Sequence, residues 1–253
     1  MPSSCAIRLR GERMIRLPLL HAALREDFPP VTAALTQPNG LLCAGGDLAP
    51  WRLLEAYRRG IFPWYSPGEP ILWWSPDPRL VFETGAMHVP RRLRRDLKRC
   101  RWSLRADTCF ADVVRACAAP RPGQGGTWIT PEMFAAYTNL HALGHAHSLE
   151  VFDGAALVGG IYGVAVGRMF FGESMFSRAT HASKVALLGL AALLRGWDWP
   201  LIDAQVESPH LYTLGGQALA RTQFVERIAR LTALPGRIGP WQGTADALDV
   251  AAL

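Results

Sequence analysis

The sequence has no apolar stretch long enough to cross a membrane. Its longest apolar run, residues 185–194, covers about half the length that a membrane-spanning helix needs. The first 16 residues contain four arginines but not the continuous apolar core of a signal peptide. We therefore expect no membrane association and a cytoplasmic location.

Cysteine is scarce, and its spacing suits neither a disulfide framework nor a zinc site. The chain has 5 cysteines, an odd number, and no Cys-x-x-Cys pair. Cys100, Cys109 and Cys117 lack the spacing of zinc ligands. Three histidines between residues 141 and 147 have no carboxylate or cysteine at ligand spacing. We expect reduced, buried thiols and no metal.

Hydrophobicity and charge are typical of a folded protein with an anionic partner. Hydrophobic residues make up 49% of the 253 residues, which is enough to bury a core and argues against disorder. The formal net charge is +6 and the pI is about 9.4. This balance favours nucleic acid as a partner, although many basic proteins bind none.

The basic residues gather in one segment. Residues 91–101 hold seven Lys or Arg residues against one Asp, and Leu93 and Leu97 would anchor one face of a helix. Solvated helices usually alternate the sign of their charges, so a run of like charges favours a polyanion over a plain surface helix. The candidate contacts to a phosphate backbone are Arg91, Arg92, Arg94, Arg95, Lys98 and Arg99.

Prolines divide the chain into two parts. Pro76 and Pro78 are typical of a linker, and we place a domain boundary there, between a small domain of residues 1–78 and a larger one of residues 79–253. Residues 1–17 have the composition of a loose, basic leader. A helix is expected from about residue 50 to residue 59.

The larger domain mixes strands and helices. Asp153-Gly154 lies between two apolar runs and predicts a hairpin, and the pattern repeats across Gly167-Arg168. A helix capped by Thr130 follows a helix at about 110–118, and a later helix at 184–197 precedes a strand at 201–206. This order predicts an α/β (α+β) fold whose mixed sheet is flanked by helices.

Two runs in this domain place polar side chains in apolar surroundings. Glu173 lies among aromatic residues and a thioether, and Asp203 and Gln205 alternate on one face of the predicted strand at 201–206. An acid and an amide on an apolar strand are costly unless something binds them. We predict that all three line a site beside an apolar pocket; the alternative is a hydrogen-bond network at a strand end.

The same runs limit the chemistry. A serine nucleophile elbow needs Gly-x-Ser-x-Gly, and Phe176 stands at the second glycine position, which excludes that class of hydrolase. An acid–amide pair suits a site that holds and deprotonates an external nucleophile, or that donates to an oxyanion. Leu187, Leu190 and Leu194 share one helix face, which would line the pocket or form plain core.

Aromatic residues crowd the predicted boundary. Trp64, Trp73 and Trp74 lie within eleven residues, among prolines. Two interpretations stay open at this point: packing between two domains, or a stacking platform for a nucleobase or a peptide.

Seven ordered blocks resemble the leucyl/phenylalanyl-tRNA–protein transferase family. They lie between about residues 38 and 224, in the order GLLCAGGDLAP (40–50), YRRGIFPW (57–64), ILWWSPDPR (71–79), GTWIT (126–130), GHAHS (144–148), FGESMFSR (171–178) and LIDAQV (201–206). The chain departs from the family at His181, where Asn is common, and at Leu190 and Leu194, where Phe occurs.

The resemblance implies a small N-terminal domain and a C-terminal domain like the GNAT acyltransferases. It implies transfer of Leu or Phe, and less well Met, from Leu-tRNA or Phe-tRNA to proteins that begin with Arg or Lys, which marks them for N-degron (N-end rule) degradation. No cofactor is required, because converting an aminoacyl ester into an amide is downhill. We expect a monomer.

The resemblance also assigns roles to residues. Asp203 and Gln205 match the proposed catalytic pair, in which the amide orients the amine and the acid relays its proton, unless the tRNA ribose hydroxyl does so. Glu173 matches an acidic site residue. The positions near the 3′-terminal adenosine are Trp64, Trp128 and Tyr137. The amino-acid pocket positions are Ile161, Phe170, Met175, Ser177, Leu187, Leu190 and Leu194.

Three rivals remain from other classes. A CoA-dependent N-acetyltransferase would need a Gly-rich pyrophosphate turn, but residues 176–182 contain no Gly. A non-catalytic RNA-binding module would have no use for an acid–amide pair beside an apolar pocket. A transferase that loads amino acids onto cell-wall precursors is nearer in chemistry, and the seven blocks favour a protein acceptor instead.

Overall fold

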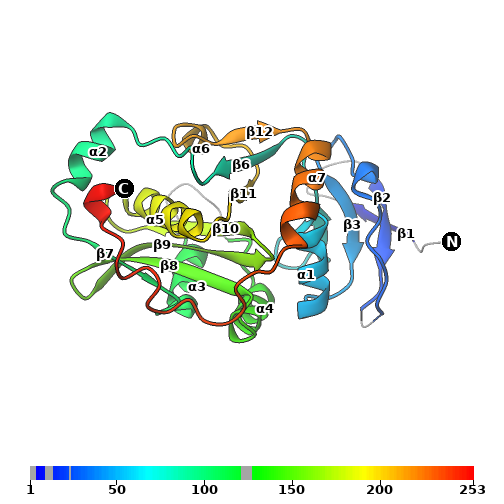
Figure 1. The fold of residues 1–253 in the computed structure, drawn as a ribbon. Helices are drawn as coiled ribbons and strands as arrows, with labels where there is room; N and C mark the ends of the chain where they lie inside the picture. Colours follow the sequence, from blue (N-terminus) through cyan, green and yellow to red (C-terminus); the bar gives the residue numbers. More distant parts are fainter. Residues whose placement is uncertain (1–3, 9–13, 23, 121–126) are drawn as a thin grey trace.

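The computed structural model describes residues 4–8, 14–22, 24–120 and 127–253. Two β-sheets lie side by side along the long axis of the molecule, and helices pack around them (Figure 1). The N-terminal strands lie at one end and helix α2 (Arg91–Leu97) lies at the other.

The first sheet is five-stranded, in the order β1-β2-β3-β5-β4. Strands β2 and β3 are parallel, and the other neighbours are antiparallel. Its strands are β1 (Ser4–Arg8), β2 (Met14–Leu20), β3 (Leu41–Gly45), β4 (Phe62–Pro63) and β5 (Leu72–Trp74).

The second sheet is seven-stranded and mixed, in the order β12-β6-β11-β10-β9-β8-β7. Only β10 and β11 are parallel among the strand pairs of this sheet in the described part of the chain. Its strands are β6 (Arg79–Glu83), β7 (Ser103–Ala106), β8 (Ala146–Asp153), β9 (Ala156–Val166), β10 (Met169–Ser177), β11 (Leu201–Gln205) and β12 (Gln217–Leu219).

Helices cover both faces of the larger sheet. Helix α5 (Ala182–Gly196) packs on one face, while α3 (Phe110–Ala118) and α4 (Pro131–Ala142) pack on the other (Figure 1). Phe170 and Phe171 are consecutive on β10, so their side chains enter the two different cores on the opposite faces. The remaining helices are α1 (Pro50–Arg58), α6 (Pro209–Tyr212) and α7 (Arg221–Thr232), with 3₁₀ turns at Val31–Ala33 and Val250–Ala252.

The predicted α/β fold is confirmed, and so are its main local signals. The β8–β9 and β9–β10 hairpins form across Asp153-Gly154 and Gly167-Arg168. Thr130 caps α4, because its hydroxyl accepts the backbone N–H of Met133 at 3.3 Å. In the described part of the chain, no helix has the length and the hydrophobicity that a bilayer crossing demands.

The prediction of a loose leader at residues 1–17 is wrong for the part that the structure describes. Strands β1 and β2 pair antiparallel, with Ile7 opposite Ile15, and β2 continues into a parallel pairing with β3. Leu17 and Leu20 are buried in the core, which anchors β2 to the sheet. The arginines of residues 1–17 suggested a loose segment, although the apolar residues of β2 alternate as in a strand.

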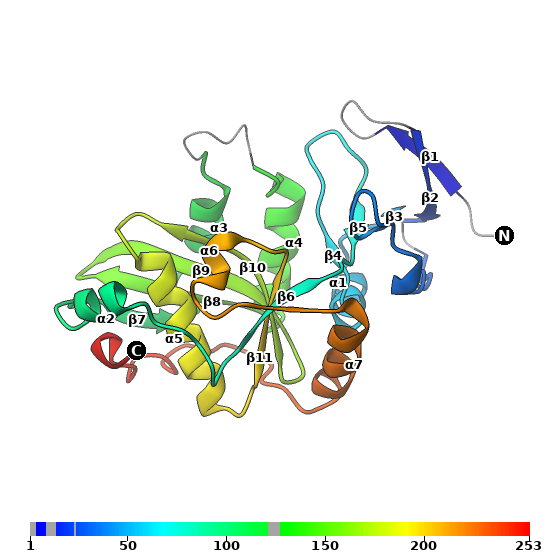
Figure 2. The same ribbon diagram turned by 90° about the horizontal axis from the view of Figure 1, so that it is seen from above.

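The boundary predicted after residue 78 lies between the last strand of the first sheet and the first strand of the second. The two parts nevertheless share a core, because helix α7, late in the chain, packs on helix α1 (Figure 2). Gly60 ends α1 with φ +73°, and a Cβ there would meet the Phe224 ring of α7 at 3.0 Å. Close packing of α1, α7 and β6 therefore brings both parts of the chain to one place.

Two neighbouring strands are irregular at that place. The register of β10 against β9 shifts between Gly172 and Ser174, and the register of β11 against β6 shifts between Asp203 and Gln205. A bulge re-aims the side chain next to it, and bulges are common beside functional sites. Glu173, Asp203 and Gln205 are the residues that these two bulges position.

Candidate active site

A buried ion pair forms the base of the site. The guanidinium of Arg79 on β6 donates to both carboxylate oxygens of Asp203 on β11, at 2.8 Å and 2.6 Å, and both side chains are 0% exposed. Arg79 also donates to the carbonyl of Gly60 at 3.0 Å and lies between the rings of Phe62 and Phe224. A buried charge is costly unless it is paired and hydrogen-bonded, and here it is both.

Asp203 in turn holds the backbone of Gln205. Its Oδ1 accepts the Gln205 N–H at 2.9 Å, and Gln205 adopts φ +63°, a left-handed conformation that is strained for a residue with a side chain. The surrounding contacts must stabilise this conformation. The ion pair therefore fixes the direction in which the Gln205 side chain leaves the strand.

The Gln205 amide points at Glu173. Its Nε2 donates to Glu173 Oε1 at 2.7 Å, so its own carbonyl oxygen remains as the acceptor that faces elsewhere. Gln205 is only 9% exposed, but it lines a pocket beside Trp64 and Trp128. This arrangement lets the amide accept a hydrogen bond from an incoming N–H group.

Two tyrosines complete the surroundings of Glu173. Tyr57 on α1 donates to its Oε1 at 2.7 Å, and Tyr137 on α4 donates to its Oε2 at 2.8 Å. The two hydroxyls are 2.6 Å apart. Burial raises the pKa of Glu173 to about 7, although these hydroxyls and the Gln205 amide lower it in part. Glu173 therefore changes charge near neutral pH.

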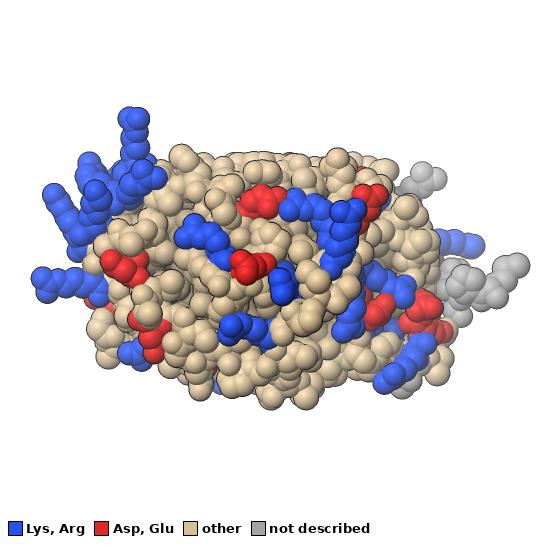
Figure 3. All heavy atoms as spheres, viewed as in Figure 1, with Lys and Arg blue, Asp and Glu red and all other residues tan. Residues whose placement is uncertain are grey.

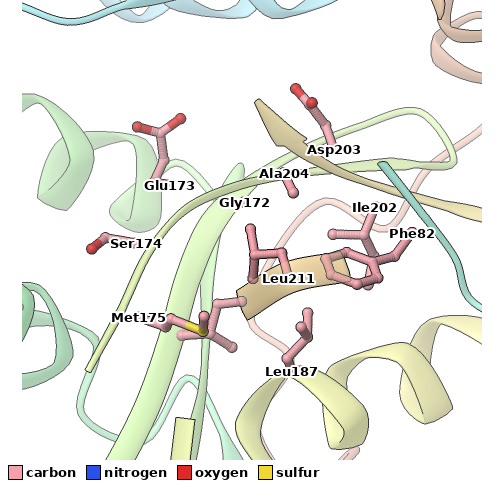
Figure 4. Close-up of a pocket in the computed structure, with 11 residues that line it drawn as sticks. Phe82, Gly172, Glu173, Ser174, Met175, Leu187, Ile202, Asp203, Ala204 and Leu211 are labelled. Atoms are coloured by element: carbon pink, nitrogen blue, oxygen red, sulfur yellow. The ribbon is translucent and has the colours of Figure 1, made fainter. Parts of the chain in front are cut away.

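An apolar pocket of about 100 Å³ adjoins these groups. Figure 4 shows the carboxylates of Glu173 and Asp203 on one side of it and apolar side chains on the other. The apolar lining consists of Phe82, Ile161, Met175, Leu187, Ile202 and Leu211. The apolar pocket therefore lies beside the carboxylates of Glu173 and Asp203.

A second pocket opens beside the first. It shares Glu173, Met175 and Leu211 with the apolar pocket, and adds Gln205 to its wall. Its aromatic lining comes from Phe62, Trp64 and Trp128. Trp73 is fully buried in the core, which agrees with the packing interpretation, whereas Trp64 is 44% exposed and the stacking interpretation stays a prediction for it.

The structure does not bring every candidate residue to these pockets. Leu190 and Leu194 lie further along α5 than Leu187, and both are packed in the core. Phe170 is buried against Trp241, at 6.0 Å between ring centroids. Ser177 ends β10, where its hydroxyl accepts the N–H of residue 183 and donates to the carbonyl of residue 179.

Tyr137 lies inside the molecule rather than on the aromatic pocket. Its ring is 0% exposed, and its hydroxyl contacts Glu173 and Tyr57. Arg79 and Tyr57 contact the acidic residues of the site but were not among its candidates from the sequence. The available signals were a charged residue directly before the apolar run 80–82 and a tyrosine on the apolar face of α1.

The basic segment forms helix α2 at one end of the molecule. Leu93 and Leu97 are buried, and the charged side chains point outward. Figure 3 shows a group of Lys and Arg side chains over this helix, with few acidic atoms beside it.

Among the described residues, no three His, Cys, Asp or Glu side chains gather where a metal ion could bind.

The fold and the site define a mixed α/β protein in which a carboxylate–amide network lies beside an apolar pocket. A family model described as leucyl/phenylalanyl-tRNA protein transferase matches residues 81–229, and the model of that family's N-terminal domain matches residues 46–77. The chain belongs to this family.

Curated relatives that carry the name of this family are similar in sequence over most of the chain. The leucyl/phenylalanyl-tRNA–protein transferase of Xanthomonas campestris is 61% identical over 224 residues, which cover 88% of this chain and 90% of the relative. The enzyme of Nitrosomonas europaea is 55% identical over 85% of this chain and 91% of its own length. The solved structure of L-PGS from Bacillus licheniformis has a TM-score of 0.39 at 8% identity, over 68% of this chain and 57% of that one, which is too distant to carry an argument.

Removing the cation of the buried ion pair should destabilise the protein strongly. Arg79→Met leaves Asp203 as an unpaired buried charge, which costs about 3–5 kcal/mol of unfolding free energy. The matched control is Arg227→Met, because Arg227 pairs with Glu83 at 2.6 Å where both side chains are about a third exposed. That change should cost less than about 1 kcal/mol. Urea unfolding measures both, and equal losses would contradict the structural role of Arg79.

Proposed function

We propose that this protein transfers Leu or Phe, and less well Met, from aminoacyl-tRNA to the N-terminal Arg or Lys of acceptor proteins. The observation that carries the proposal is the junction of an apolar pocket with the Glu173–Gln205 pair. An apolar pocket suits the side chain of the transferred residue, and the polar pair suits the amine that attacks its ester. Family membership supports the same reaction.

The reaction needs an oriented amine. The free α-amine of a protein has a pKa of about 7.7–8.0, so part of it is neutral at pH 7. The Gln205 carbonyl would accept one N–H of this amine and aim its lone pair at the ester carbon. Asp203 is a positioning residue in this proposal, because it fixes the backbone of Gln205 while both of its oxygens are engaged by Arg79.

The apolar pocket would select the transferred residue by burial. Full burial of a Leu, Met or Phe side chain contributes about 1.5–3 kcal/mol relative to water. One methylene changes binding by only about 1–3 kcal/mol, so overlapping use of Leu, Phe and Met is expected, while charged residues are excluded. Leu190 and Leu194 do not line this pocket, although they belong to the same buried cluster as Leu187.

The aromatic pocket and helix α2 would hold the tRNA. Trp64 and Trp128 offer ring faces for the 3′-terminal adenosine, and base–aromatic stacking contributes about 1–3 kcal/mol per base. Helix α2 would contact phosphates without reading sequence.

We further propose that the protein acts as a monomer in the cytoplasm and needs no cofactor. Its products would be marked for N-degron degradation.

The direct test is a transfer assay. Leu-tRNA and a reporter protein that begins with Arg are incubated with the enzyme, and the reporter is weighed by mass spectrometry. A gain of one Leu residue is the expected result. A reporter that begins with an acidic residue is the control, and it should gain nothing. An unchanged Arg reporter in the presence of intact Leu-tRNA would refute the proposed function.

Shortening Met175 should affect Leu transfer more than tRNA binding. Met175→Ala removes part of the wall shared by both pockets, and we expect kcat/KM for Leu-tRNA to fall by about tenfold, equivalent to about 1.4 kcal/mol of transition-state stabilisation. The dissociation constant for uncharged tRNA should change less than twofold. Met14→Ala, at an exposed position of β2 in the first sheet, is the control. A parallel loss of both quantities would exclude a pocket role.

Neutralising helix α2 should flatten the salt dependence of tRNA binding. Each lost phosphate contact reduces the slope of log K against log salt by about 0.7–0.9, so Arg94, Arg95 and Lys98 changed together to Gln should reduce it by about 2–3. The control changes three exposed arginines elsewhere, at positions 16, 58 and 230. If both triple variants shift the slope equally, α2 is not the phosphate-binding element.

A further inference from the structure

Three oxygen-bearing groups form a closed triangle at the junction of the two pockets. The Tyr57 hydroxyl lies 2.7 Å from Glu173 Oε1, the Tyr137 hydroxyl lies 2.8 Å from Glu173 Oε2, and the two hydroxyls lie 2.6 Å apart. All three separations are ordinary lengths for O–H···O hydrogen bonds. Each contact therefore calls for one hydrogen between its two oxygens.

The triangle has too few hydrogens when Glu173 is ionised. A carboxylate accepts but cannot donate, and each tyrosine hydroxyl supplies one hydrogen. Two hydrogens then serve three contacts, so one pair of oxygens faces each other without a proton. A proton on the carboxyl would complete the ring, with each of the three groups donating to the next. The geometry thus provides a place for one more proton.

The other polar side chains of the site are either fully engaged or do not ionise. Asp203 is held by two charge-assisted bonds from Arg79 and is 0% exposed. Gln205 carries an amide, which has no titration near neutral pH. Glu173 is partly exposed and lines both the apolar pocket and the aromatic pocket, so it can meet a group bound in either.

We propose that Glu173, closed into a ring with the hydroxyls of Tyr57 and Tyr137, takes the proton that the acceptor amine loses during transfer and returns it to the departing ribose oxygen. This proposal rests on the proposed function and adds a proton carrier to it. In the sequence-based assignment, Asp203 relayed this proton. The hydrogen-bonded ring instead assigns this proton to Glu173, because its carboxylate can accept one more hydrogen.

The step balances without a further reactant. The amine nitrogen forms a bond to the ester carbonyl carbon, and the bond from that carbon to the ribose oxygen breaks. The nitrogen loses one proton to the Glu173 carboxylate, and the ribose oxygen leaves with a proton from the resulting carboxylic acid. The ring then returns to its state with two hydrogens, ready for another amine.

The charges around Glu173 support this role. It faces Tyr57 from α1, Tyr137 from α4, Tyr162 from β9, and Gln205 and Asp203 from β11. The negative charge of Asp203 is balanced by Arg79 of β6. Burial raises the pKa of Glu173 to about 7, close to that of an α-amine, so proton transfer in either direction is nearly balanced.

The test is the pH profile of single-turnover Leu transfer at saturating acceptor. The base and the attacking amine must both be deprotonated, so the rate of the unaltered enzyme should rise with pH through about 7, where Glu173 titrates, and again through about 7.7–8.0, where a free α-amine titrates. Glu173→Gln should lower the plateau by about 10²-fold or more and remove the lower inflection, that of Glu173, while the inflection of the amine remains. Its affinity for uncharged tRNA should stay within twofold.

Two tyrosine variants keep the test decisive if Glu173→Gln folds poorly. Tyr137→Phe removes a donor to the ionised carboxylate, which raises the pKa of Glu173, so the inflection should move to higher pH while transfer persists. Tyr162→Phe is the matched control. The Tyr162 hydroxyl is buried in the same cluster and has no hydrogen-bond partner among the described residues, so the inflection should not move.

Two outcomes would overturn the proton carrier. One is a Glu173→Gln enzyme that keeps the lower inflection, near pH 7, and stays within threefold of the plateau. The other is an inflection that does not move in Tyr137→Phe. Both outcomes are read from enzymes that still transfer Leu, so they differ from a failure of the proposed function, in which the unaltered enzyme would transfer nothing.

Discussion

The buried pair of Arg79 and Asp203 is the interaction on which the site depends. It joins β6 to β11, reaches the end of α1 through the Gly60 carbonyl, and holds Gln205 in a left-handed conformation. An ion pair sealed from water is a poor source of net stability compared with apolar packing. Its value here lies in geometry, because the two strands can adopt only one alignment when both charges are satisfied.

Around this pair, the site is assembled from both parts of the chain. Tyr57 and the Gly60 carbonyl come from the N-terminal part, while Glu173 and Gln205 come from the larger sheet. Helix α7 returns from near the C-terminal end to pack on α1 and fixes the two parts against each other. The apolar pocket, the polar network and the aromatic pocket meet there, so an ester and an amine bound in the two pockets would share Glu173 as a neighbour.

Local sequence patterns predicted much of the fold, but they did not predict the contacts that build the site. Hairpin turns, the Thr130 cap and the alternation that sends Ile202 and Asp203 to opposite sides of β11 are short-range signals, and the structure follows them. The partners of Glu173 and Asp203 are Tyr57 and Arg79, which lie 116 and 124 residues away in the sequence. Contacts over such separations cannot be predicted from local periodicity. The bulge at Gln205 likewise arises from pairing with β6. For the same reason, helical spacing grouped Leu190 with Leu187 although only one of them reaches the pocket.

The central claim is that Asp203 acts through Gln205, and a double-mutant cycle tests it most directly. Single-turnover Leu transfer is measured for Asp203→Asn, Gln205→Ala and the two changes together, each on folded protein with tRNA binding verified. If the acid only positions the amide, the double variant should be no slower than the slower single variant. Losses that multiply would show that the two residues act independently and would contradict the account.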